Sequence, residues 1–95
     1  MTPVKRLVID VLKPHEPSTI DFARQVAETN TVAAVNATLI ELDQEVKNLK
    51  LTLEGDAIEY DDVKAVVEDA GGTIHSVDQV VCGEHLVEDA PTPQD

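Results

Sequence analysis

Apolar and polar residues alternate over residues 4–12, and this period of two predicts a β-strand with one buried face. The same alternation runs through residues 32–45 and 46–53. Because only a short polar break separates these two segments, they predict an antiparallel hairpin. A last alternating segment, residues 73–81, follows two glycines and predicts a fourth strand.

Two further segments repeat their apolar residues with helical spacing. The first runs to about residue 29 and begins after Ser18 or Thr19, either of which can accept a hydrogen bond from the exposed N–H groups of the first turn. The second begins near Glu59 and has apolar residues at positions i, i+3, i+4 and i+7. Gly71 follows it, and glycine tolerates the left-handed conformation that ends many helices.

The predicted order of elements is therefore βαββαβ, an α+β arrangement. Right-handed crossovers place both helices on one face of a four-stranded antiparallel sheet with strand order 4-1-3-2. The domain spans residues 1–86, and residues 87–95, rich in proline and acids, predict a disordered acidic C-terminal tail. The other sheet face has no helix to cover it, and we expect it to carry part of the last strand together with Arg6, Val8, Asp10, Asn36, Thr38, Ile40, Lys50 and Thr52.

Composition changes this picture in two ways. Only Phe22 and Tyr60 are aromatic, so the core of this 95-residue chain is thin and burial in a homo-oligomer would help it. The chain also has 19 acidic against 7 basic residues and a net charge of −12, which predicts adaptation to a salt-rich cytoplasm, where salt screens the repulsion. The alternative is an ordinary acidic soluble domain. Such a charge favours divalent cations and argues against binding to nucleic acid.

Cys82 is the only cysteine, which excludes an intramolecular disulfide and a Cys-x-x-Cys motif. The N-terminus leads directly into the first strand without an apolar signal region, and no apolar run approaches the roughly 18 residues that span a membrane. We therefore expect a cytoplasmic protein that does not enter the membrane.

Two carboxylates are candidates for a metal site. Asp10 lies in the first strand and Asp78 in the last, and these strands are neighbours in the predicted order. Facing carboxylates repel each other unless a cation neutralises them, and with nearby amide or hydroxyl oxygens they suit Ca²⁺ or Mg²⁺. Asn36, Thr38 and Ser76 are the candidate oxygen donors. The alternative is that this face is solvated or packed against another subunit.

Two histidines are candidates for proton transfer or transition-metal binding. His15 follows the first strand and His75 begins the fourth, so antiparallel pairing brings both near Asp10. The alternative is that each histidine makes only local structural contacts. His75 and the adjacent Ser76 point to opposite faces of a regular strand, which forbids a nucleophile–base hydrogen bond between them. We therefore expect no enzymatic activity.

Three segments together resemble the uncharacterised archaeal family called domain of unknown function 211. They are LVIDVLKPHEP (residues 7–17), VN with ELD (35–36 and 41–43) and GGTIHSVDQVVCG (71–83). The resemblance implies a ferredoxin-like βαββαβ fold and assembly into a ring or another homo-oligomer, and the family has no assigned activity. Its polar motif positions correspond here to Asp10, His15, Asn36, Asp43, His75, Ser76 and Asp78. The acidic excess and acidic tail depart from the family pattern and indicate a haloarchaeal member.

The same order of elements occurs in small-molecule-sensing ACT domains, which bind amino acids near the loop after the first strand. Here that loop, residues 13–18, has no glycine to bring backbone close to a ligand, so the similarity is one of fold only. The leading hypothesis is a non-enzymatic homo-oligomeric binding or regulatory module, and the alternatives are a divalent-metal-binding protein using Asp10 and Asp78 and an ACT-like sensor. The residues expected at a ligand site or subunit interface are His15, Asn36, Asp43, His75 and Ser76.

Overall fold

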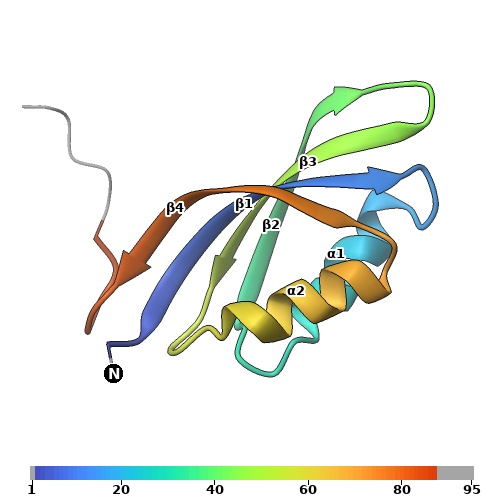
Figure 1. Ribbon diagram of the computed structural model, residues 1–95. Coiled ribbons are helices and arrows are strands. Elements are labelled where there is room, and N and C mark those ends of the chain that lie inside the picture. The colour runs from blue at the N-terminus through green and yellow to red at the C-terminus, as the bar shows by residue number, and fades with distance from the viewer. Residues whose placement is uncertain (1, 88–95) are drawn as a thin grey trace, which may run out of the picture.

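The computed structural model describes residues 2–87. Its elements follow the predicted order: β1 (Val4–Pro14), α1 (Thr19–Ala27), β2 (Ala34–Leu42), β3 (Val46–Glu54), α2 (Tyr60–Asp69) and β4 (Thr73–Cys82). All strand pairs are antiparallel and the sheet order is β2-β3-β1-β4, which confirms the predicted ferredoxin-like topology (Figure 1). Apart from Val87, the predicted tail lies outside the described residues.

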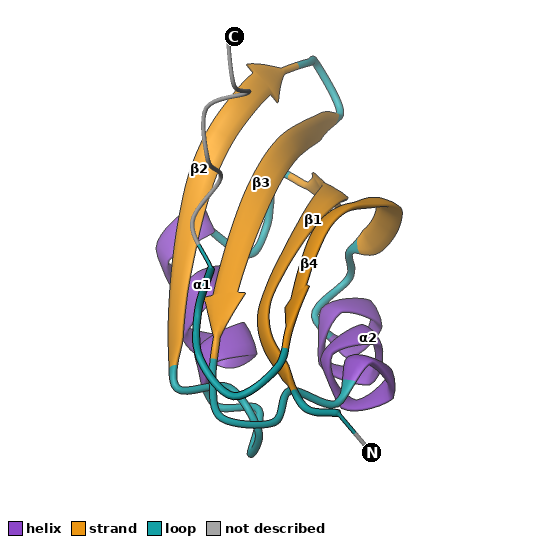
Figure 2. Ribbon diagram, turned by 90° about the vertical axis from the view of Figure 1, so that its left-hand side faces the viewer, coloured by secondary structure: helices purple, strands orange, loops and turns teal. Residues whose placement is uncertain are grey.

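Both helices lie on one side of the sheet, α1 nearest β2 and α2 nearest β4 (Figure 2). The space between sheet and helices is filled by aliphatic side chains and a single aromatic ring. Its fully buried members are Ile9, Val11, Phe22, Val26, Leu49, Leu51, Leu53, Val63 and Val67. Among residues 2–87, no helix covers the opposite side of the sheet, which is called the open face below.

Ser18 caps the first helix as the sequence predicts, and this helix is shorter than expected. Glu59 precedes α2 but makes no capping hydrogen bond with its side chain. The Ser18 Oγ accepts a hydrogen bond from the Asp21 N–H at 3.1 Å, which starts α1. This helix ends at Ala27 rather than near residue 29, and Glu28 closes it by donating its N–H to carbonyls of the last turn. Gly71 follows α2 with a φ of 95°, a backbone conformation that residues with a Cβ rarely adopt.

The last strand differs from a regular strand in a way that affects the site. Opposite residues 8–11 of β1, β4 contains two extra residues, His75 and Asp78, each of which forms a bulge in the ladder. Ser76 lies directly opposite Asp10, and His75 shares a surface hollow with Asp10, so His75 and Ser76 both lie on the open face. The expectation that they point to opposite faces is wrong, because the bulge interrupts the alternation.

Candidate functional site

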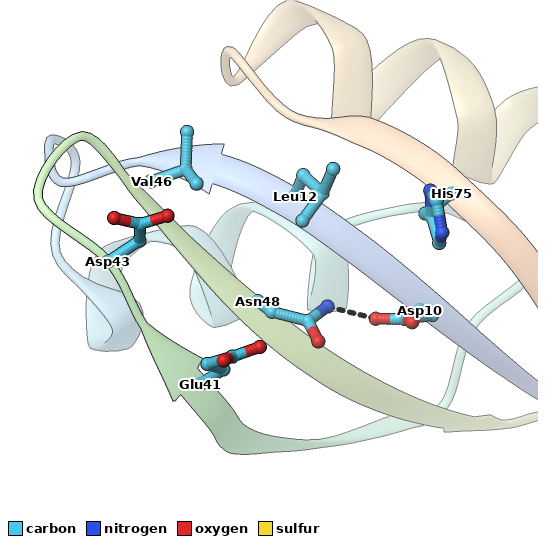
Figure 3. A pocket seen from close by; sticks show the side chains of 7 residues that line it. All are labelled: Asp10, Leu12, Glu41, Asp43, Val46, Asn48 and His75. Atoms are coloured by element: carbon cyan, nitrogen blue, oxygen red, sulfur yellow. Dashed lines mark hydrogen bonds between the residues drawn. The ribbon is translucent and has the colours of Figure 1, made fainter.

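The open face carries a hollow of about 270 Å³ where β1 and β3 approach the β2–β3 turn (Figure 3). All four strands and the turn contribute to its wall, so the hollow exists only in the folded sheet. Its lining residues are Asp10, Leu12, Glu41, Asp43, Val46, Asn48 and His75. It is called the Asp10 hollow below.

One hydrogen bond fixes the floor of the Asp10 hollow. The Asn48 Nδ2 donates to the Asp10 Oδ1, and also approaches the Val11 carbonyl oxygen at 3.3 Å (Figure 3). Both side chains are half-buried, so their orientations are held by the sheet and not by solvent. Among the described residues, none donates a hydrogen bond to the second oxygen of Asp10, which leaves that oxygen available to a ligand.

The charge of the hollow favours positively charged ligands. Asp10, Glu41 and Asp43 supply three carboxylates, and no lysine or arginine lines the hollow. Leu12 and Val46 form an apolar part of the wall, against which a hydrocarbon stem can pack. The combination suits a small molecule with a cationic group and a short apolar portion.

A buried lysine closes the loop between β1 and α1. The Lys13 side chain is 0% exposed, and its Nζ lies 5.7 Å from the centre of the Phe22 ring. This ammonium donates to the carbonyl oxygens of Pro14 at 2.5 Å, of His15 at 3.5 Å and of Pro17. The loop therefore wraps around one cation, which engages three of its backbone carbonyl groups.

The Lys13 ammonium is disfavoured in the folded protein even though it binds carbonyl oxygens. Burial lowers the pKa of Lys13, the positive charge of Lys47 lowers it further, and Glu16 acts in the opposite direction. Lys47 lies directly opposite Lys13 in the β1–β3 ladder.

His15 connects this loop to the Asp10 hollow without lining it. Its Nε2 lies 2.8 Å from the Asp43 carbonyl oxygen. Because a carbonyl oxygen only accepts hydrogen bonds, that nitrogen carries the proton. Asp43 does line the hollow, so the hydrogen bond from His15 to its backbone helps to hold this part of the wall in place. Of the two histidines expected near Asp10, the structure brings only His75 into the hollow.

The remaining predicted residues lie elsewhere on the open face. Thr38 Oγ1 donates to Asn36 Oδ1 at 3.0 Å near the β2 edge. Ser76 Oγ donates to Asp78 Oδ1 at 2.7 Å near the β4 edge. Asp78 does not face Asp10 in the ladder and lines a different depression from the one that Asp10 lines.

Residues 2–87 contain no group of three or more His, Cys, Asp or Glu side chains arranged to hold a metal ion. Within the same residues, neither helix is long and apolar enough to cross a membrane.

Sequence reasoning missed three residues that shape the site. Asn48 is two residues before Lys50 in the same strand, so the two share a face. Because Lys50 was expected on the open face, the position of Asn48 could have been inferred. Glu41 reaches that face only because β2 has a bulge between Leu39 and Glu41, and nothing in the local pattern indicates the bulge. Lys13 lies in a proline-rich segment that predicts a strand end, and a buried lysine has no sequence signature.

The fold and the hollow together define a class: a ferredoxin-like α+β domain with a polar ligand-sized hollow on its uncovered sheet face. The comparison with known families is more specific. The profile of the DUF211 family, described as "Uncharacterized ArCR", matches residues 5–95, and the chain belongs to this family. It is 42% identical to the uncharacterized protein MJ0319 of Methanocaldococcus jannaschii, in an alignment that covers 100% of this chain and 98% of that relative.

Proposed function

We propose that this protein is a homo-oligomeric binding module that takes up a small cationic molecule in the Asp10 hollow and performs no chemistry on it. The observation that carries this proposal is the convergence of three carboxylates and the anchored Asn48 amide on one hollow that no lysine or arginine lines. A volume of about 270 Å³ exceeds that of a bare metal ion and suits a small amine or guanidinium compound.

The hydrogen bonds of the polar residues support a binding role over a catalytic one. Nucleophilic catalysis requires a hydroxyl hydrogen-bonded to a general base such as histidine. Ser76 instead donates its hydroxyl hydrogen to Asp78, and His15 donates to a backbone carbonyl. The anchored amide beside Asp10 holds a carboxylate in one orientation, which suits charge recognition.

The test compares two matched substitutions by isothermal titration calorimetry in molar KCl, with putrescine and arginine as probes. Asp10→Asn changes the charge of the hollow with little change in shape and should abolish the binding heat. Asp78→Asn makes the same chemical change outside the hollow and should leave the binding heat intact. Unchanged binding to the Asp10→Asn variant, or no binding of either probe to the wild type, would refute the proposed ligand class.

The second candidate is a divalent cation shared by Asp10 and Asp78, favoured by the high carboxylate content of the open face. It is less well supported, because the two residues line different depressions. The same pair of variants separates the candidates when the probes are Ca²⁺ and Mg²⁺. A shared cation requires that both substitutions weaken its binding, whereas the Asp10 hollow requires an effect of Asp10→Asn alone.

The homo-oligomeric part of the proposal rests on a thin core and on apolar side chains left at the surface. Among the described residues, Leu42, Val80 and Val87 are examples that are 60%, 49% and 58% exposed. Light scattering in molar KCl measures the assembly directly. A monodisperse species with the 10.3 kDa mass of one chain would contradict this part and leave the ligand test unaffected.

A further inference from the structure

Lys50 is an exposed cation in the middle of the open face. It lies on the central strand β3, directly opposite Asp10 of β1 on one side and Thr38 of β2 on the other. Arg6 lies on the same face and forms an ion pair with Glu54 at 2.9 Å. Among residues 2–87, no acidic side chain forms an ion pair with Lys50. In a chain with 19 acidic and only 7 basic residues, this lysine is a candidate contact for an anionic group of a ligand.

Asp10 and Lys50 are neighbours that do not pair. Opposite charges at facing positions of antiparallel strands commonly contact each other, because their Cβ atoms are only about 5 Å apart. Here the Asn48 Nδ2 donates to the Asp10 Oδ1 and holds the carboxylate at the floor of the Asp10 hollow (Figure 3). Lys50 does not line that hollow and lines two other depressions instead. The open face therefore presents a negative and a positive group side by side, each in a different depression.

One of these depressions, of about 470 Å³, offers hydrogen-bond donors and is called the Lys50 depression below. Its polar lining residues are Asn36, Thr38, Lys50, Thr52 and Glu54. The Thr38 hydroxyl donates to the Asn36 Oδ1, and within residues 2–87 nothing accepts a hydrogen bond from the Asn36 Nδ2. The Glu54 carboxylate is occupied by its ion pair with Arg6. Ammonium, amide and hydroxyl donors that remain available here are the groups that bind a carboxylate.

The Asp10 hollow and the Lys50 depression are close enough for one small molecule to reach both. Asn48 lines the hollow, and Lys50 and Thr52 follow it on the same face of β3 at steps of two residues. At about 3.3–3.4 Å per residue, each step covers roughly 7 Å. A short aliphatic chain between a cationic group and a carboxylate spans such a step.

We propose that the ligand of the open face is zwitterionic, with its cationic group in the Asp10 hollow and its carboxylate bound by Lys50 in the Lys50 depression. This rests on the proposed function and narrows the ligand class from small cations to amino acids with a cationic side chain. The three carboxylates of the hollow repel a carboxylate and attract the cationic end of the ligand. The Lys50 ammonium does the reverse, so the two charges together set the orientation of the ligand.

The test uses pairs of ligands that differ only in one carboxylate, namely arginine with agmatine and ornithine with putrescine. Agmatine and putrescine carry one more positive charge than their partners, so the net charge of −12 favours them. A preference for arginine therefore has to come from local recognition of its carboxylate. In isothermal titration calorimetry in molar KCl, the wild type should bind arginine about fivefold more tightly than agmatine, which is the upper end of what one exposed ion pair contributes.

Substitutions of Lys50 locate the carboxylate contact. Lys50→Met should weaken arginine binding about fivefold and leave agmatine binding unchanged, so the preference disappears. Lys50→Glu should reverse the preference, because the new carboxylate repels that of arginine and attracts agmatine. Lys64→Met, at an exposed position on α2, removes the same charge away from the open face and should keep the wild-type preference. Asp10→Asn should weaken both members of a pair, because it acts on the cationic end.

Circular dichroism establishes that each variant is folded, and two different substitutions at the exposed Lys50 provide independent readings of one contact. A wild type that binds agmatine as tightly as arginine overturns the zwitterionic ligand and leaves the cationic ligand of the proposed function intact. A preference for arginine that persists in Lys50→Met overturns the assignment of the carboxylate to Lys50. Failure of the wild type to bind any of the four probes refutes the proposed function itself, so the failures are distinguishable.

Discussion

Replacing Lys13 by methionine should destabilise the protein through the loop that follows β1. Methionine keeps an apolar stem against Phe22 and removes the ammonium that binds the carbonyls of Pro14, His15 and Pro17. Three hydrogen bonds from a charged donor contribute about 4–5 kcal/mol, at roughly 1.5 kcal/mol each. Burying an ion costs several kcal/mol even after the protein relaxes; a value of about 3 kcal/mol applies where carbonyl oxygens replace part of the lost hydration, and this cost disappears in the variant. The net loss is about 2 kcal/mol.

A loss of this size is measurable by urea unfolding followed by circular dichroism. The midpoint should fall by about 1–2 M without a change in slope, and the melting temperature should fall by roughly 8–16 °C. Lys47→Met is the matched control. It removes the neighbouring charge that helps to lower the pKa of Lys13, so its stability should equal or exceed that of the wild type. A Lys13→Met variant as stable as the wild type would refute the role of the ammonium in holding the loop.

The pH dependence gives an independent check. The pKa of Lys13 is lower in the folded protein than its usual value of 10.5, because burial and Lys47 disfavour the charge. Between the lowered value and 10.5 the unfolded state therefore binds more protons, so this group makes stability rise with pH in that window. The stability difference between the wild type and Lys13→Met should widen as pH approaches 10.5. A difference that narrows over this range would contradict the assigned direction.

Three shorter predictions concern backbone packing, the floor of the Asp10 hollow and net charge. Gly55→Ala should cost about 2–3 kcal/mol in urea unfolding, because its Cβ would collide with the Thr31 carbonyl oxygen, and an unaffected midpoint would be inconsistent with this contact. Asn48→Ala should cost about 1–2 kcal/mol by the same assay, since half-buried Asp10 loses its donor; a neutral result would mean that water replaces the amide. Raising KCl from 0.1 to 1 M should raise the melting temperature by several degrees, because salt screens a net charge of −12, and a fall would contradict salt adaptation.

The order of elements could be predicted from the sequence because every strand and helix carries its own periodic signal. The hairpin of β2 and β3 and the cap at Ser18 are examples in which local chemistry and tertiary structure agree. The extent of β1 was underestimated, since the strand continues to Pro14. Proline lacks only its own backbone N–H donor, so it can occupy the last position of a strand. The end of β1 therefore comes two residues later than the prolines of the loop indicated.

The site was harder to predict, because it depends on register. Asp10, Asp43 and His75 were identified and do share the hollow, whereas Asn36 and Asp78 lie outside it. Alternation of apolar and polar residues predicts which face of the sheet a side chain lies on, but not which residues lie opposite it on the next strand. Each bulge shifts the pairing of two strands by one residue. The bulges in β4 do leave a trace. Its helix-side residues Ile74, Val77 and Val80 are spaced by three instead of two.

That spacing has a consequence for how the chain can change by insertion and deletion. Without His75 and Asp78, β4 would still read Ile74, Ser76, Val77, Gln79 and Val80, a regular alternation with the same partners on β1. The sheet therefore does not need the two bulge residues for its register. Deleting either one would shorten the strand without turning the remaining side chains over, so these are the positions in β4 where a length change is least disruptive to the core. Their presence in the chain is accounted for by what they add to the open face, not by the packing beneath it.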